Sequence, residues 1–361
     1  MSSITGKNIQ ISVFGQSHSP AAGVVIDGLP AGFRLDIDRI AAFMARRAPG
    51  GSAIVTARRE SDEPEILSGL SDGCTCGAPL TAIIRNTDAR SGDYAGIADT
   101  PRPSHADYAA FVKYKGFNDV SGGGHLSGRL TAPLCFAGAV CMQYLESCGI
   151  KIRSHIYSVG DVKDEPFDPV RPDGAAIDET FPVIDTACGD RMKALIESVR
   201  AQGDSVGGVI ECAVTGVPAG VGDPMFDGLE NVIAKNVFAI PAVKGVEFGA
   251  GFGISAMRGS EANDPFRADG GKITTVTNNS GGINGGISNG MPIIFRAAFR
   301  PTPSIAKTQI TVNIKTGANA ELSTDGRHDP CVVVRAAPAV EAAAAVSVFD
   351  LMHDVQCTTD K

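Results

Sequence analysis

The chain has 361 residues, of which 43% are apolar and 20% charged, which is ordinary for a globular protein with a sizeable core. Tryptophan is absent and aromatic residues make up only 6%, so the core must consist mainly of Ala, Val, Ile and Leu. The net charge of −8 gives no basic surface for nucleic acid or an anionic membrane, and any anionic ligand would have to meet a local cluster of arginines.

The N-terminal segment lacks a basic stretch followed by an apolar run, and no segment reaches the roughly 18 apolar residues of a membrane span, which predicts a cytoplasmic protein. Short strands are expected over residues 8–14 and 23–27, on either side of a turn-rich segment. Asp36 should cap a helix that runs to about Arg47, where a Pro-Gly-Gly sequence stops it.

The middle of the chain is expected to form a strand over 79–85, followed by a polar, turn-rich segment and by three glycines at 122–124. A helix from about 132 to 148 is so rich in Ala, Gly and Cys that it should pack closely on all sides. An amphipathic helix over 188–203 precedes a strand over 206–216.

The second half continues with a helix over 227–238 and then with the tract 277–290, which contains five glycines and four asparagines. Glycine lets backbone N–H groups approach a ligand, so the tract indicates a ligand contact, and the alternative is a flexible loop. The isoleucines in the tract and the strand-like run over 291–299 favour a tract that lies on the fold. A last buried helix is expected over 338–352.

The two halves echo each other weakly, because a Gly-rich His/Arg segment leads into a buried small-residue helix at 122–148 and again at 326–352. No Pro/Ser-rich linker separates them. The pattern predicts one α/β unit over residues 1–361 with internal pseudo-symmetry, in preference to two independent domains.

Three histidines, His18, His105 and His328, lie in turn-forming motifs of the kind that present side chains on loops. A single histidine in such a motif is more often a structural residue than a catalyst. For the three together, a role in acid–base catalysis is about as well supported as a structural role. The sequence has no HExxH or paired CxxC spacing, so no metal site is predicted. Phosphate-loop, dinucleotide and GxSxG motifs are also missing.

Arginines supply the remaining chemistry. Arg47, Arg129, Arg300 and Arg327 could clamp a carboxylate or phosphate in a bidentate manner. The sequence therefore combines glycine-rich backbone with histidines and arginines, and this combination indicates a small anionic ligand.

Eight motifs, in order, resemble the chorismate synthase family over nearly the whole chain. They lie at 14–18 (Phe-Gly-Gln-Ser-His), 46–50, 86–91, 102–107 (Arg-Pro-Ser-His-Ala-Asp), 203–208, 241–247, 281–286 and 326–331 (Gly-Arg-His-Asp-Pro-Cys). The resemblance implies a β-α-β sandwich with antiparallel sheets around a central helical layer, assembled as a homotetramer. It implies a lyase that converts 5-enolpyruvylshikimate 3-phosphate into chorismate and phosphate by 1,4-elimination with reduced FMN, the last common step of the shikimate pathway.

The resemblance also implies roles for individual residues. His18 resembles the acid that protonates the departing phosphate, His105 the group that protonates or stabilises reduced flavin, and Asp329 the carboxylate that assists proton movement at flavin N5. Arg47, Arg129 and Ser17 correspond to positions that bind substrate or NADP. The flavin-binding positions correspond to His125, Leu126, Ser127, Pro241, Ala242, Gly285, Arg300, Pro301, Thr302, Pro303, Ser304 and Arg327.

Some positions depart from the family pattern. His125 stands where the family has an arginine, Ala53 where it has another, and Ser19 and Ser104 where it has glycine. The contact missing at Ala53 could come from Arg58 or Arg59. A flavin-binding descendant without catalysis is therefore an alternative, and a phosphotransferase that needs Mg²⁺ and a nucleotide is a weaker one. The sequence leaves open whether NADPH or a separate flavin reductase reduces the flavin.

Overall fold

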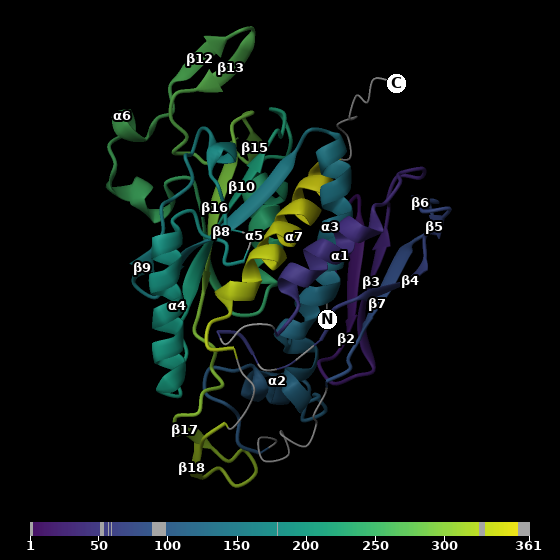
Figure 1. Cartoon of the computed structure of the whole chain (residues 1–361), viewed down its shortest axis with the longest axis vertical. Helices are drawn as coiled ribbons and strands as arrows, with labels where there is room; N and C mark the ends of the chain where they lie inside the picture. The colour runs from purple at the N-terminus through teal and green to yellow at the C-terminus, as the bar shows by residue number, and fades with distance from the viewer. Residues whose placement is uncertain are drawn as a thin grey trace.

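The computed structural model describes residues 3–50, 54–56, 58, 60–88, 99–178, 180–324 and 329–352. Two five-stranded antiparallel sheets lie on either side of a layer of helices (Figure 1). The first sheet has the spatial order β1 (Ile4–Thr5), β2 (Gln10–Gly15), β3 (Ala21–Asp27), β7 (Leu80–Arg85) and β4 (Pro64–Ser68). The second has the order β11 (Val243–Phe248), β16 (Ile293–Phe299), β10 (Gly208–Thr215), β8 (Lys151–Val159) and β9 (Val162–Lys163). This arrangement confirms the predicted fold class.

The helical layer contains α1 (Ile37–Arg47), α3 (Thr131–Ser147), α5 (Leu229–Phe238) and α7 (Val333–Leu351). Helix α4 (Thr186–Ala201) packs on β8 and β9. The short elements include α2 (Asp107–Lys113), α6 (Gly259–Ala262), and the hairpins β5–β6 (Leu70–Ser71, Cys74–Thr75), β12–β13 (Phe266–Asp269, Lys272–Thr275), β14–β15 (Ile283–Asn284, Ile287–Ser288) and β17–β18 (Gln309–Val312, Asn319–Leu322).

Local signals gave most element positions correctly. The Asp36 side chain accepts a hydrogen bond of 3.1 Å from Arg39 N and caps α1, as predicted. The last helix begins at Val333, five residues before the predicted start, so Pro338 lies inside it. Proline is disfavoured there because it removes a helical hydrogen bond, but burial of Val333 and its neighbours outweighs this cost.

Helices α3 and α7 approach each other at Gly138, because a Cβ built there would overlap both Cα and Cβ of Ala342. Residues 342–345 of α7, all alanines, are completely buried. The small residues of both helices are therefore required by the short distance between them, as their composition predicts.

A buried charged network holds the second sheet together. His155 on β8 is fully buried, with Nδ1 3.1 Å from Asp164 Oδ2 and Nε2 2.9 Å from Glu211 Oε2. Carboxylates only accept hydrogen bonds, so both ring nitrogens must carry protons. Arg296 on β16 donates a hydrogen bond of 2.8 Å to the other oxygen of Glu211 and balances the second negative charge.

This network makes stability depend on pH. Burial alone would lower the pKa of His155, but the hydrogen bonds and charges of Asp164 and Glu211 outweigh it and raise the pKa. Because the folded state binds this proton more tightly, the stabilisation is complete below the unfolded pKa of about 6.5 and is lost as pH rises through the folded pKa.

We therefore expect the free energy of unfolding to decrease above neutral pH. Denaturant titrations across this range should show that His155→Gln lowers stability at pH 6 and removes part of the pH dependence. An unchanged slope in the variant would contradict the assignment of an imidazolium.

The tract 277–290 lies on the fold, so the flexible-loop alternative is wrong. The buried Asn278 donates from Nδ2 to the carbonyls of Pro169 and Pro292, both at 2.8 Å. Asp264 accepts hydrogen bonds from the backbone N–H groups of Asn279 and Ser280. The hairpin β14–β15 turns at Gly285 and Gly286, whose φ angles of 65° and 85° suit a two-residue turn that favours glycine.

Among the described residues, no helix is long and apolar enough to cross a membrane.

Candidate active site

Several polar loops converge at one end of the helical layer, the end near α2 at the bottom of Figure 1. They include residues 16–20 between β2 and β3, residues 60–62 before β4, residues 86–88 after β7, and the 3₁₀ segments η2 (Ser121–Leu126) and η3 (Gly128–Leu130). Residues 102–107, at the start of α2, complete the group. Of the residues that the sequence singles out, these loops carry Ser17, His18, His105, His125, Leu126 and Arg129.

His18 and His105 lie against consecutive glycines of η2. A Cβ on Gly122 would overlap the His18 ring and come within 2.7 Å of Ser17 Oγ, while a Cβ on Gly123 would lie 3.2 Å from His105 Cε1. Both glycines have positive φ, 61° and 86°, and a side chain at either would be strained. The bare turn therefore brings together two histidines that are far apart in the sequence.

His105 is oriented by a carboxylate. Its Nδ1 lies 2.5 Å from Asp107 Oδ1, and because a carboxylate can only accept, Nδ1 carries the proton. Arg102 donates to both Asp107 oxygens, at 2.8 and 2.9 Å, and its Nη2 is also 3.1 Å from the His105 ring. Burial opposes ionisation of Asp107, but the bonds from Arg102 and His105 outweigh it and lower its pKa. His105 Nε2 makes no hydrogen bond to a residue of the described chain, so it can exchange a proton.

The backbone at Ser104 shows why glycine would suit this position. Its φ of 58° lies in the left-handed region that glycine adopts without strain. Serine at this position therefore introduces local strain next to His105.

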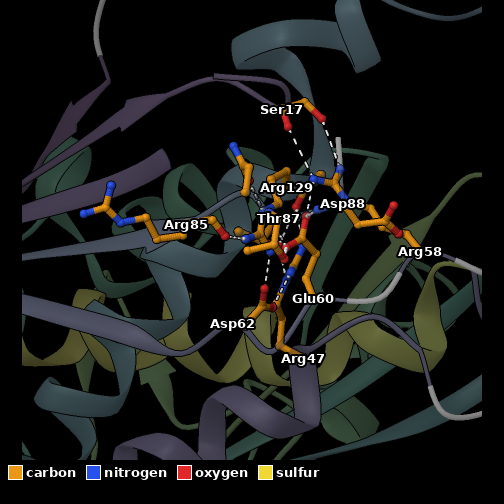
Figure 2. A network of polar contacts seen from close by, with 12 residues as sticks. Ser17, Arg47, Arg58, Glu60, Asp62, Arg85, Thr87, Asp88 and Arg129 are labelled. Atoms are coloured by element: carbon orange, nitrogen blue, oxygen red, sulfur yellow. Dashed lines mark hydrogen bonds and ion pairs between the residues drawn. The ribbon is translucent and has the colours of Figure 1, made fainter. Parts of the chain in front are cut away.

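Arg47 and Arg129 meet at a shared carboxylate (Figure 2). Arg47 Nη1 lies 2.5 Å from one oxygen of Asp62, and Arg129 Nη1 forms an ion pair with the other. Both arginines are only 4% exposed and Asp62 1%. Burial alone would raise the pKa of Asp62, but the two guanidiniums reverse the effect and lower it.

A second carboxylate supports the loop of His18. Glu60 accepts hydrogen bonds from Arg58, at 2.7 Å, and from Thr87 N and Oγ1. Arg58 also lies 3.4 Å from both Ser17 Oγ and Ser17 O (Figure 2). Arg58 therefore contacts the loop of His18, as it must if it supplies the contact that is missing at Ala53. Arg59 lies outside the described residues.

The predicted flavin segment 300–304 lies beside Pro241 and Ala242, because Arg300 N donates a 3.0 Å hydrogen bond to Ala242 O. Ala242 has φ of 77°, a strained value for alanine. Ser304 Oγ accepts a 3.2 Å bond from Arg102, which connects this segment to His105. Pro301 is exposed, and Pro303 O accepts a bond from Gln309.

Two polar groups in this segment lack partners within the described chain. Thr302 Oγ1 is buried without a hydrogen bond. The guanidinium of Arg300 forms no hydrogen bond or ion pair with a described residue, and burial lowers its pKa. Such groups suit an anionic, hydrogen-bonding ligand.

Three other predicted flavin positions follow the glycine turn. Both nitrogens of His125 are occupied, since Nδ1 donates to Gly15 O and Nε2 lies 2.7 Å from Ser3 Oγ. Leu126 is exposed, and Ser127 Oγ accepts from Arg129 N at 3.3 Å. The His125 side chain therefore connects η2 to the start of the His18 loop.

Two further predicted residues lie in the described chain. Asp329 forms an ion pair with Arg335 of α7 and accepts a 2.9 Å bond from Thr56 N. Arg335 also donates a 3.4 Å hydrogen bond to Arg47 O, so Asp329 lies close to Arg47. Gly285 lies in the β14–β15 turn, at the opposite end of β16 from Arg300, and its flavin contact stays a prediction. Arg327 lies outside the described residues.

Sequence reasoning missed Asp62, Glu60, Arg102 and Asp107 as parts of the site. Asp107 was detectable, because a carboxylate two residues after a histidine can orient its ring. Asp62 and Glu60 lie in a run of mostly charged residues that resembles a solvated surface.

Comparison with known proteins agrees with the geometry. The sequence model of the chorismate synthase family matches residues 9–353. The chorismate synthase of Korarchaeum cryptofilum is 46% identical, covering 96% of this chain and 96% of the relative, and that of Dehalococcoides mccartyi strain BAV1 is 45% identical, covering 97% and 96%. A crystal structure of chorismate synthase superposes with a TM-score of 0.75 and 26% identity over 97% of this chain and 93% of that chain. The chain therefore belongs to the chorismate synthase family.

Proposed function

We propose that this protein converts 5-enolpyruvylshikimate 3-phosphate into chorismate and inorganic phosphate by a 1,4-elimination with reduced FMN, the last common step of the shikimate pathway. The observation that carries the proposal is the placement of His18 and His105 against one glycine turn. Imidazole exchanges protons near neutral pH, so two such rings can serve a leaving group and a cofactor in one site.

His18 is the acid that protonates the departing phosphate oxygen. Its loop lies beside the Arg58 guanidinium, which contacts Ser17 and favours an anion at this position. Arg47, Arg129 and Arg327 are the further groups proposed to attract the substrate's anions. Asp107 holds the His105 Nδ1 proton, which leaves Nε2 to hold or move a proton on the cofactor side.

The segment 300–304 fits reduced FMN, which when bound would supply electron density to the allylic system of the substrate. The unpaired Arg300 guanidinium and the buried Thr302 hydroxyl offer an anion contact and a hydrogen bond. Pro241, Ala242, His125, Leu126, Ser127 and Gly285 complete the set of residues that would hold it. Asp329 is proposed to assist proton movement from its position beside Arg335.

The test is anaerobic phosphate release. Purified protein with dithionite-reduced FMN should release phosphate from 5-enolpyruvylshikimate 3-phosphate, without Mg²⁺ or a nucleotide. His18→Ala and His105→Ala should each lower kcat by about 100-fold or more. A parallel reaction with oxidised FMN and NADPH tests whether the protein reduces its own flavin. No turnover with reduced FMN would refute the proposal.

A flavin-binding protein without catalysis is the second candidate. The observation that favours it is that both nitrogens of the His125 ring already have partners, at a position where the resemblance implies an arginine. Titration with FMN separates the two functions, because binding without phosphate release and without an effect of the histidine variants would support this candidate.

The same proposal includes a cytoplasmic homotetramer of single-domain chains, with a separate flavin reductase as partner where NADPH alone does not suffice. Gel filtration with light scattering measures the subunit number directly.

A further inference from the structure

We propose that Asp62 is a positioning residue of the anion site, which holds the Arg47 and Arg129 guanidiniums in a fixed mutual orientation. The inference rests on the proposed function, because it assigns those arginines to substrate anions. None of the motifs that carry the family resemblance includes Asp62.

Four parts of the fold meet at this carboxylate (Figure 2). Arg47 comes from the last turn of α1 and Arg129 from η3 before α3, while Asp62 precedes β4. The end of β7 contributes Arg85 O and Asn86 Oδ1, which accept hydrogen bonds from Arg129 at 3.1 and 2.8 Å. Asp62 is the only carboxylate, among the described residues, that forms ion pairs with both arginines.

Each guanidinium has a similar set of bonds. Arg47 donates from Nε to Thr131 Oγ1, from Nη1 to Asp62 and from Nη2 to Gly128 O. Arg129 donates from Nε, Nη1 and Nη2 to Asn86, Asp62 and Arg85 O. Because a guanidinium has five N–H groups, two on each arginine make no hydrogen bond within the described chain. The neutral acceptors fix the plane of each group, and Asp62 fixes the two planes relative to each other.

Without Asp62 the two cations would repel each other in a buried site. Burial and the nearby charge of Arg47 both lower the pKa of Arg129, and Asp62 opposes this effect. One carboxylate between two guanidiniums leaves a net positive charge, as the binding of an anion requires.

The backbone at Asp62 also restricts which side chain can do this. Its φ of 54° is in the left-handed region, which Asp and Asn adopt more readily than most other residues. A longer acid would keep the charge but place it differently.

The main test is therefore Asp62→Glu, which preserves the charge and moves the carboxylate by about one methylene. We expect KM for 5-enolpyruvylshikimate 3-phosphate to rise at least about 10-fold, with a smaller fall in kcat. A second readout needs no turnover. Saturating inorganic phosphate should raise the Tm of the wild type by stabilising the folded state, and this shift should be lost in the variant.

Glu65→Gln is the matched control, because it removes the carboxylate of an exposed ion pair with Arg85 in the same segment. It should leave both readouts unchanged. Asp62→Asn fits the backbone but removes the charge, and we expect it to lose the phosphate shift as well.

Folded Asp62→Glu protein with wild-type KM and a wild-type phosphate shift would overturn the proposal and leave Asp62 a structural residue only. If the wild type releases no phosphate, the proposed function fails, while the comparison of Tm shifts still decides the role of Asp62.

Discussion

Gly122→Ala should lower kcat for phosphate release by at least about 100-fold, because a methyl group at this position would displace the His18 ring. The added Cβ would overlap the ring and lie 2.7 Å from Ser17 Oγ. The residue also has φ of 61°, so alanine would strain the turn even if the ring moved. Overpacking of this kind costs about 1–3 kcal/mol, which should leave the protein folded. Steady-state kinetics and circular dichroism on the same sample measure the two effects.

Gly128→Ala is the matched control for this experiment. Gly128 lies close by in η3, and a Cβ there has no neighbour within 4 Å. We expect its kcat to stay within about twofold of wild type. Wild-type kcat in folded Gly122→Ala protein would show that the turn does not position His18.

The second large effect is on stability. Gly→Ala in a helix interior normally stabilises by about 1 kcal/mol, but Gly138→Ala should have the opposite sign. A Cβ there would overlap Ala342 on α7, and the neighbouring helices cannot separate without disturbing a completely buried alanine run. We expect the free energy of unfolding to fall by about 1–3 kcal/mol, measured by urea titration.

Gly259→Ala provides the comparison, because Gly259 is also helical and a Cβ there meets nothing within 4 Å. It should be neutral or slightly stabilising. Equal effects of the two substitutions would argue against the close approach of α3 and α7.

Elements with local signals could be predicted from the sequence, and α1 is the clearest case because its cap and its apolar spacing agree. Strand β8 could not, since it carries Ser154 and His155 at buried positions. Ser154 bonds Glu341 on α7 and His155 bonds Glu211 on β10, so their burial depends on partners far away in the chain.

The residues of the candidate site divide in the same way, into those that local patterns predict and those whose burial depends on distant partners. Turn motifs predicted His18 and His105 as site residues, whereas Asp62 is buried only because Arg47 and Arg129 reach it from two other elements. Gly285 is only fifteen residues before Arg300 in the sequence, but β16 runs between them for seven residues, roughly 20 Å. Closeness in the sequence therefore says little about closeness in this part of the fold.

The glycine turn at 122–123 has a further consequence for how the protein can change. The His18 and His105 rings pack on neighbouring glycines of one backbone segment, so a displacement of that segment shifts both rings together. A single substitution in the turn acts differently, because a side chain on Gly122 would meet His18 and one on Gly123 would meet His105.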